Sequence, residues 1–258
     1  MSGKGFRIAI SGKGGVGKTM LAALLVRNLS KVGSVLAIDA DPDANLAPAL
    51  GVEVKKTVGQ VREFIIEASP RSLDGTDKIS ALEMALHDVV VETEGFDVLV
   101  MGRSEGPGCY CAINNIVRQV IDYKANSYDF TVLDCEAGLE HLSRRTSQDM
   151  DLMIAVTEPT LNGILTARRV HELASELSIS FLEIVVVANK VTPETKPIVE
   201  RLAQENGLKI AAYIPYDPQV SRLDVLGEPI IKLPEAAPAS QAVKDFCSWI
   251  TEKSLILK

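Results

Sequence analysis

The stretch of sequence that decides the fold is Gly12-Lys13-Gly14-Gly15-Val16-Gly17-Lys18-Thr19, which fits the pattern G-x-x-x-x-G-K-[ST]. It follows the apolar run Phe6 to Ser11 and precedes Met20 to Leu29, whose apolar positions suit a buried helix. In that context the glycines let backbone N–H groups and the helix N-terminus face a phosphate. We therefore predict a nucleotide site, with Lys18 neutralising the β and γ oxygens and Thr19 ligating Mg²⁺. The predicted ATP contacts here are Gly12, Lys13, Gly14, Gly15, Val16, Gly17, Lys18, Thr19 and Met20.

Strand and helix patterns alternate along the rest of the chain. Apolar runs without alternation are typical of strands covered on both faces. Strands are predicted at Phe6–Ser11, Val35–Ile38, Phe96–Val100, Phe130–Leu133, Leu152–Val156 and Ile184–Ala188. Helices are predicted at Thr57–Glu67, Ala112–Tyr123, Leu161–Leu177, Lys196–Glu205 and Ser240–Ile250. This order predicts one α/β P-loop domain over residues 1–258, with a mostly parallel sheet flanked by helices on both faces.

Composition limits the function classes. The 258 residues carry 27 Lys plus Arg and 34 Asp plus Glu, a formal net charge of −7, which disfavours nonspecific binding to nucleic acid or acidic membranes. No apolar run reaches the roughly 18–20 residues of a membrane span, so we expect a cytoplasmic protein. Four cysteines are too few for a disulfide framework in a chain of this size, which leaves metal binding, chemistry or packing as their use.

Carboxylates follow two of the predicted strands. Asp134 ends the apolar run Phe130-Thr131-Val132-Leu133, as a Mg²⁺-binding Walker B segment does. Asp39-Ala40-Asp41-Pro42-Asp43 follows the second strand and places carboxylates at a carboxyl end, where doubly wound sheets bind ligands. Asp39 and Asp43 have an alternative role as hydrogen-bonding or helix-capping residues.

A pair of thiols lies in Gly106-Pro107-Gly108-Cys109-Tyr110-Cys111, just before a predicted helix. A helix N-terminus lowers a thiol pKa and favours the thiolate that binds metals. One chain supplies two sulfurs, whereas a closed soft-metal site takes about four ligands, so a two-fold dimer would complete the site. Four thiolates suggest Zn²⁺ or an Fe–S cluster; ligand type alone does not select nickel. Cys135 is interpreted as a small buried residue, with metal ligation as the alternative, and Cys247 as core.

The loop resembles the deviant Walker A motif, K-G-G-x-G-K-T, of the MinD-type ATPases, in which two chains sandwich two nucleotides. The resemblance implies that Lys13 crosses to the partner's phosphates and that Asp41 orients or deprotonates the attacking water, beside Mg²⁺ held by Thr19, Asp41 and Asp134. It makes Lys13, Lys18 and Asp41 the catalytic set. Cys135-Glu136-Ala137-Gly138 continues the family's switch II, although Glu136 stands where many members have proline. Asn189 and Pro215 resemble adenine-side elements, and an Asn amide can pair with adenine.

A narrower resemblance combines the two lysines, Asp39-Ala40-Asp41-Pro42-Asp43-Ala44-Asn45-Leu46, the Cys109/Cys111 segment and Asp134-Cys135-Glu136-Ala137-Gly138-Leu139-Glu140-His141. Together these look like the CooC/AcsF nickel-insertion ATPases, which mature carbon monoxide dehydrogenase or acetyl-CoA synthase. The resemblance implies a homodimer with ATP and Mg²⁺, in which Cys109 and Cys111 bind Ni²⁺ at the interface and Zn²⁺ competes.

Two rival functions stay open. One is a MinD- or ParA-like positioning switch on membrane or DNA, which the acidic charge and the thiol pair disfavour. The other is an Fe–S carrier or reductase-like ATPase with an interfacial cluster. The expected partners are a second copy and the nickel enzyme client, without nucleic acid or membrane; the sequence does not name the client.

Overall fold

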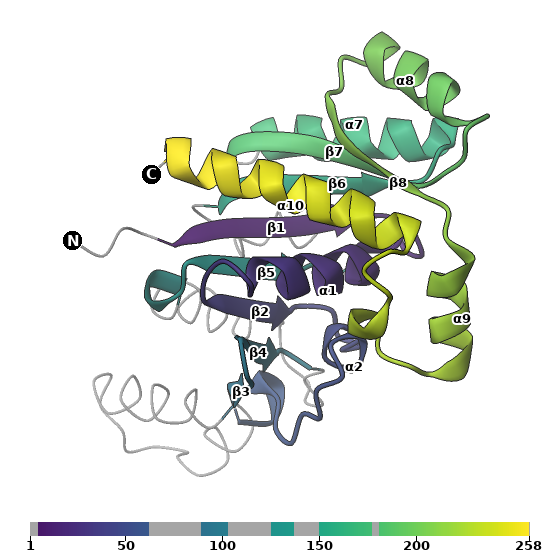
Figure 1. The fold of residues 1–258 in the computed structure, drawn as a ribbon. Helices are drawn as coiled ribbons and strands as arrows, with labels where there is room; N and C mark the ends of the chain where they lie inside the picture. Colours follow the sequence, from purple (N-terminus) through teal and green to yellow (C-terminus); the bar gives the residue numbers. More distant parts are fainter. Residues whose placement is uncertain (1–4, 62–88, 103–124, 137–149, 177–180, 258) are drawn as a thin grey trace.

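The computed structural model describes residues 5–61, 89–102, 125–136, 150–176 and 181–257. Their strands form one eight-stranded sheet in the order β3-β4-β2-β5-β1-β6-β7-β8 (Figure 1). Neighbouring strands pair in parallel, except that β3 is antiparallel to β4. The strands are β1 (Phe6–Gly12), β2 (Val35–Asp39), β3 (Val91–Glu92), β4 (Phe96–Val100), β5 (Phe130–Asp134), β6 (Met150–Thr157), β7 (Phe181–Val191) and β8 (Ile210–Pro215).

Helices cover both faces of this sheet. The described helices are α1 (Lys18–Leu29), α2 (Leu46–Ala49), α7 (Leu161–Glu176), α8 (Lys196–Glu205), α9 (Pro218–Leu226) and α10 (Pro238–Leu257), with 3₁₀ turns η1 (Ala125–Ser127) and η2 (Ile230–Lys232). Figure 1 shows α1 and α10 across one face and α7 behind the other. Successive residues of β1 divide accordingly: Ile8 and Ile10 pack in the cluster under α1 and α10, whereas Ala9 belongs to the opposite cluster.

The predicted α/β architecture is confirmed. All six predicted strands are present, and most are longer by one or more residues. The predicted helices at 161–177, 196–205 and 240–250 correspond to α7, α8 and the central part of α10. Residues 58–61 are helical, but the rest of the helix predicted to Glu67 and the whole of that at 112–123 lie outside the described residues. The extent of one domain over residues 1–258 stays a prediction.

β3 and α9 were not predicted from the sequence. β3 is two residues long, too short for a periodic pattern. α9 has no buried residue, and only Val220 and Leu223 pack partly buried against the core, so its apolar stripe is too narrow to identify a helix. Its start is fixed instead by Pro218 and by the N-cap Asp217.

The order of the strands positions the site. β1 lies between β5 and β6, and β2 lies beyond β5, so the carboxyl ends of β1, β2 and β5 lie side by side. Those ends carry the glycine-rich loop, Asp39 and Asp134. Ligands of open parallel sheets bind at this edge.

Candidate nucleotide and magnesium site

Three side chains hold carbonyl groups of the glycine-rich loop. Nζ of Lys18 donates to the carbonyl of Lys13 at 3.5 Å, Nζ of Lys190 to that of Gly15 at 2.9 Å, and Nδ2 of Asn189 to that of Val16 at 2.7 Å. A planar trans peptide bond places its N–H opposite its C=O. The N–H groups that follow Gly15 and Val16 therefore point away from Asn189 and Lys190, the orientation needed to face a bound phosphate.

Gly17 cannot carry a side chain here. Its backbone is left-handed, with φ of 95°, and a Cβ atom would lie 2.2 Å from Nδ2 of Asn189. Gly17 is also the N-cap of α1 and provides no side-chain cap. The first N–H groups of α1 thus keep the capacity to bind an anion, and an added methyl group would displace the amide that braces the loop.

Asp134 and Thr19 fit a magnesium ion. Oγ1 of Thr19 donates to Oδ2 of Asp134 at 2.8 Å. Asp134 is 1% exposed, and its Oδ1 is buried without a hydrogen-bond partner among the described residues. Burial raises the pKa of Asp134 to about 7, further raised by Asp39 and Asp41 and opposed by Thr19 and Lys18. A cation would satisfy the free oxygen and favour the ionised carboxylate.

The two aspartates of the second predicted segment differ in their surroundings. Asp39 is fully buried, and its carboxylate accepts from the backbone N–H groups of Leu46 at 2.8 Å and Asp41 at 3.1 Å. Burial raises the pKa of Asp39 to about 6. Asp39 therefore stabilises the turn through hydrogen bonds to its backbone. This confirms the alternative prediction that Asp39 is a hydrogen-bonding residue. Asp41 is partly exposed, accepts from the N–H of Asp43 at 2.9 Å, and is close enough to act on the pKa of Asp134.

Within the described ranges, no three His, Cys, Asp or Glu side chains form a metal-binding group by themselves. A magnesium ion at Asp134 would accordingly need the Thr19 hydroxyl and oxygens from nucleotide or water. That requirement fits Mg²⁺, which commonly uses one or two carboxylates together with substrate phosphates.

A small pocket brings together the remaining predicted nucleotide contacts. It has a volume of about 80 Å³ and lies beside the loop. Its lining is Gly17, Met20, Asn189, Lys190, Pro215, Tyr216, Asp217, Val220, Ser221 and Ala239. Met20, Asn189 and Pro215 thus share one cavity, although they come from three separate segments. This position beside the phosphate loop suits a nucleoside, and direct contact with adenine stays a prediction.

Sequence reasoning missed two organising residues of this pocket. Asp217 is 4% exposed and accepts from the N–H groups of Gln219 at 3.0 Å and Ala239 at 3.1 Å, so one carboxylate fixes the beginnings of α9 and α10. Lys190 lines the pocket and contacts the loop. Lys190 directly follows Asn189, and Asp217 lies two residues after Pro215, so the available signal was a charged residue close to each predicted adenine-side residue.

The two described cysteines, Cys135 and Cys247, are buried free thiols. Cys135 is 4% exposed and packs in the core, and burial raises its pKa to about 12. Cys247 is also buried, with its pKa raised by burial to about 11. Their interpretation as packed residues is confirmed. Cys109, Cys111 and His141 lie outside the described residues.

Comparisons of the chain with known protein families and structures agree with the nucleotide-site geometry of the glycine-rich loop. A family model described as the CobQ/CobB/MinD/ParA nucleotide binding domain matches residues 8–230. The chain belongs to this family. The resemblance of the loop to MinD-type ATPases is thereby confirmed at family level, as is the MinD-like fold. A cell division ATPase MinD of Pyrococcus furiosus superposes with a TM-score of 0.72 at 22% identity, covering 96% of this chain and 99% of that one.

Two curated relatives extend the comparison. An uncharacterized ATP-binding protein of Methanocaldococcus jannaschii is 46% identical over 95% of this MinD/ParA-family chain and 98% of its own length. The carbon monoxide dehydrogenase accessory protein CooC of Rhodospirillum rubrum is 32% identical over 86% of this chain and 88% of its own. No helix in the described parts is long and apolar enough to cross a membrane.

Proposed function

We propose that this protein is a dimerising, Mg²⁺-dependent ATPase that delivers Ni²⁺ to carbon monoxide dehydrogenase or acetyl-CoA synthase. The observation that carries the proposal is the 32% identity to the CooC accessory protein across 86% of the chain. Support comes from Cys109 and Cys111, which supply the thiolates that a nickel carrier needs.

The arrangement of the site supports ATP binding and hydrolysis. ATP supplies the phosphoryl group whose transfer to water drives the cycle, and Mg²⁺ neutralises its developing charge. Lys18 presents its ammonium at the loop, while Thr19 and Asp134 hold the magnesium ion. Asp41 orients the attacking water or accepts its proton, for which its partly exposed carboxylate is suited. Lys13, exposed within the loop, reaches the phosphates of the partner subunit.

Ni²⁺ is the cargo of this ATPase. Each protomer contributes Cys109 and Cys111, and the two-fold axis of the dimer completes a four-thiolate site for one Ni²⁺. Nucleotide binding favours the dimer and therefore the closed metal site; hydrolysis separates the protomers and opens it. Zn²⁺ competes because the same thiolates suit it.

Metal stoichiometry tests this function. Protein purified anaerobically with Mg²⁺ and a non-hydrolysable ATP analogue should bind one Ni²⁺ per dimer in equilibrium dialysis, and sedimentation should show that Ni²⁺ raises the dimer fraction. Cys109→Ser or Cys111→Ser should abolish tight binding and leave basal ATP hydrolysis intact. Cys247→Ala is the matched control, since it removes a buried thiol and should retain the nickel site.

Three results would contradict the nickel proposal. One tightly bound nickel per monomer, or full affinity after removal of either thiol, would refute the shared site. A brown protein with stoichiometric iron and sulfide would support the Fe–S carrier instead. ATP-dependent binding to lipid vesicles or DNA without nickel binding would support a positioning switch.

A further inference from the structure

Lys190 connects the ends of two neighbouring strands to the glycine-rich loop. Its Nζ donates to the carbonyl of Gly15 at 2.9 Å and to Oε1 of Glu158 at 2.6 Å. Lys190 lies near the end of β7, and Glu158 directly follows β6. One ammonium group therefore ties two strand ends to the loop at the end of β1.

The backbone of Lys190 is unfavourable for a lysine. Its φ is 57°, in the left-handed region that glycine adopts without steric cost. The register between β7 and β8 shifts between Ala188 and Val191, so the strand is irregular at this point. A glycine would serve the backbone at least as well. The presence of lysine therefore points to a role for its side chain.

The ion pair with Glu158 stabilises the fold too little to explain why a lysine stands at position 190. The side chains of Lys190 and Glu158 are 43% and 37% exposed, and ion pairs this open to water contribute little to folding. Glu158 nevertheless places a carboxylate next to a loop built to receive phosphates. Unpaired, that carboxylate would repel the incoming anion; Lys190 neutralises it.

The contact with Gly15 sets the direction of a peptide group. Gly15 has φ of 78°. Apart from its chain neighbours, no heavy atom lies within 4 Å of the position that a Cβ atom would take. Contacts at that position therefore do not determine the conformation of the loop. The ammonium of Lys190 holds the Gly15 carbonyl toward β7. The N–H of Val16, across the same planar peptide bond, then points in the opposite direction.

We propose that Lys190, held by Glu158, is a positioning residue that orients the Gly15–Val16 peptide for phosphate binding and neutralises the carboxylate beside it. The inference rests on the proposed nucleotide binding and adds to it a residue outside the glycine-rich motif. Its partner Asn189 braces the next peptide through Val16, so β7 supplies two consecutive supports for the loop.

Four variants test the proposal by calorimetric affinity for Mg-ADP and by thermal unfolding without nucleotide. Lys190→Met and Lys190→Gly should each weaken ADP binding by roughly tenfold, the usual size of one lost hydrogen bond to a charged group. Lys190→Gly should also unfold at the parent temperature or above, because the left-handed strain is relieved. Lys190→Met/Glu158→Gln should recover part of the lost affinity. Lys209→Met, which removes the 3.0 Å ion pair with Glu183, should match the parent in affinity.

A loss of affinity in Lys190→Gly without loss of stability would distinguish positioning from a purely structural role. The proposal is overturned if both single variants bind ADP within twofold of the parent, or if their affinity falls only in proportion to unfolding. A parent protein that binds no nucleotide would instead refute the proposed ATPase function itself.

Discussion

Thr19 and Asp134 are hydrogen-bonded across 115 positions of sequence, with 2.8 Å between Oγ1 and Oδ2, while Oδ1 of the same buried carboxylate is without a partner among the described residues. The contact joins the first turn of α1 to the end of β5. It already orients the hydroxyl and the carboxylate that the sequence assigns to magnesium. A cation entering here needs little rearrangement of the protein.

The raised pKa of Asp134 predicts a stability that falls with rising pH. The ordinary value is 3.8 and the folded value about 7, so between these values the unfolded chain releases the proton and the folded chain retains it. The contribution of Asp134 to stability without Mg²⁺ is therefore complete below about pH 4 and is lost progressively as the pH rises to about 7, which should lower the Tm over that range. Asp39, with its pKa raised to about 6, adds to the decline.

Asp134→Asn isolates that contribution, because an amide has no proton to lose in this range. Thermal unfolding of the parent and the variant at pH 5, 6, 7 and 8 should show a shallower decline for the variant. Equal slopes would mean that Asp134 titrates near its ordinary pKa. The variant should also bind Mg-ADP more weakly than the parent at pH 8, where the carboxylate is ionised.

The two lysines of the loop should give different phenotypes. Lys18 is 8% exposed and contacts the loop from within, so Lys18→Ala should remove the main phosphate charge and abolish measurable ATP binding. Lys13 is exposed, so Lys13→Ala should preserve binding to the monomer and lower hydrolysis by about 10³-fold or more. Calorimetry and phosphate release check this. Equal losses of affinity would contradict the action of Lys13 across the dimer.

Asp41→Asn should produce an ATP-bound dimer that turns over very slowly, because an amide cannot accept a proton and orients water less well. Asp41 is partly exposed and lies close enough to Asp134 to act on its pKa, a position from which Asp41 can reach a water. Sedimentation with ATP should show a persistent dimer. Asp43→Asn is the matched control, since Asp43 is exposed and should leave turnover close to that of the parent. Normal phosphate release by Asp41→Asn would refute its role.

The sequence predicted what local pattern determines and missed what tertiary contacts determine. The glycine motif and the buried strands could be recognised because the residues that define each of them are adjacent in the sequence, as in Phe130–Asp134. Lys190 was missed because it acts on the carbonyl of Gly15, which is distant in sequence. The contact of Asp217 with the N–H of Ala239 is distant in the same way, although its N-cap contact with Gln219 is local. No periodicity marks such a contact, which exists only once the fold forms.

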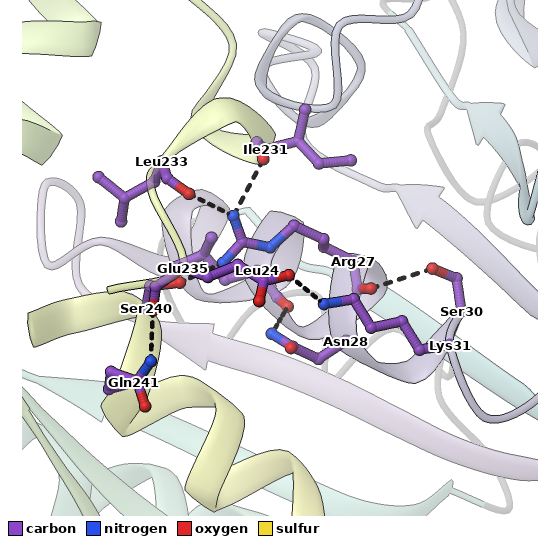
Figure 2. A network of polar contacts seen from close by, with 10 residues as sticks. All are labelled: Leu24, Arg27, Asn28, Ser30, Lys31, Ile231, Leu233, Glu235, Ser240 and Gln241. Carbon is purple, nitrogen blue, oxygen red and sulfur yellow. Dashed lines mark hydrogen bonds and ion pairs between the residues drawn. The ribbon is translucent and has the colours of Figure 1, made fainter. Parts of the chain in front are cut away.

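Arg27 connects α1 to the segment that follows α9 and to the first turn of α10. Its guanidinium donates to the carbonyls of Ile231 at 3.0 Å and Leu233 at 2.5 Å and to the hydroxyl of Ser240 (Figure 2). Burial lowers the pKa of Arg27, and the charge of Glu235 opposes that effect. Arg27→Met keeps the aliphatic stem and leaves these acceptors without their donor, at a cost of roughly 2–3 kcal/mol.

Thermal unfolding should therefore show a Tm lower by roughly 5–10 °C for Arg27→Met. Lys31→Met is the matched control one turn further along: it removes the exposed 2.5 Å ion pair with Glu235 and should shift Tm by about 2 °C or less. The ADP affinity of folded Arg27→Met should stay close to that of the parent, because Arg27 lies in the last turn of α1, at the opposite end from the phosphate loop. Equal Tm values for the two variants would show that the three contacts of Arg27 stabilise the fold no more than a surface ion pair does.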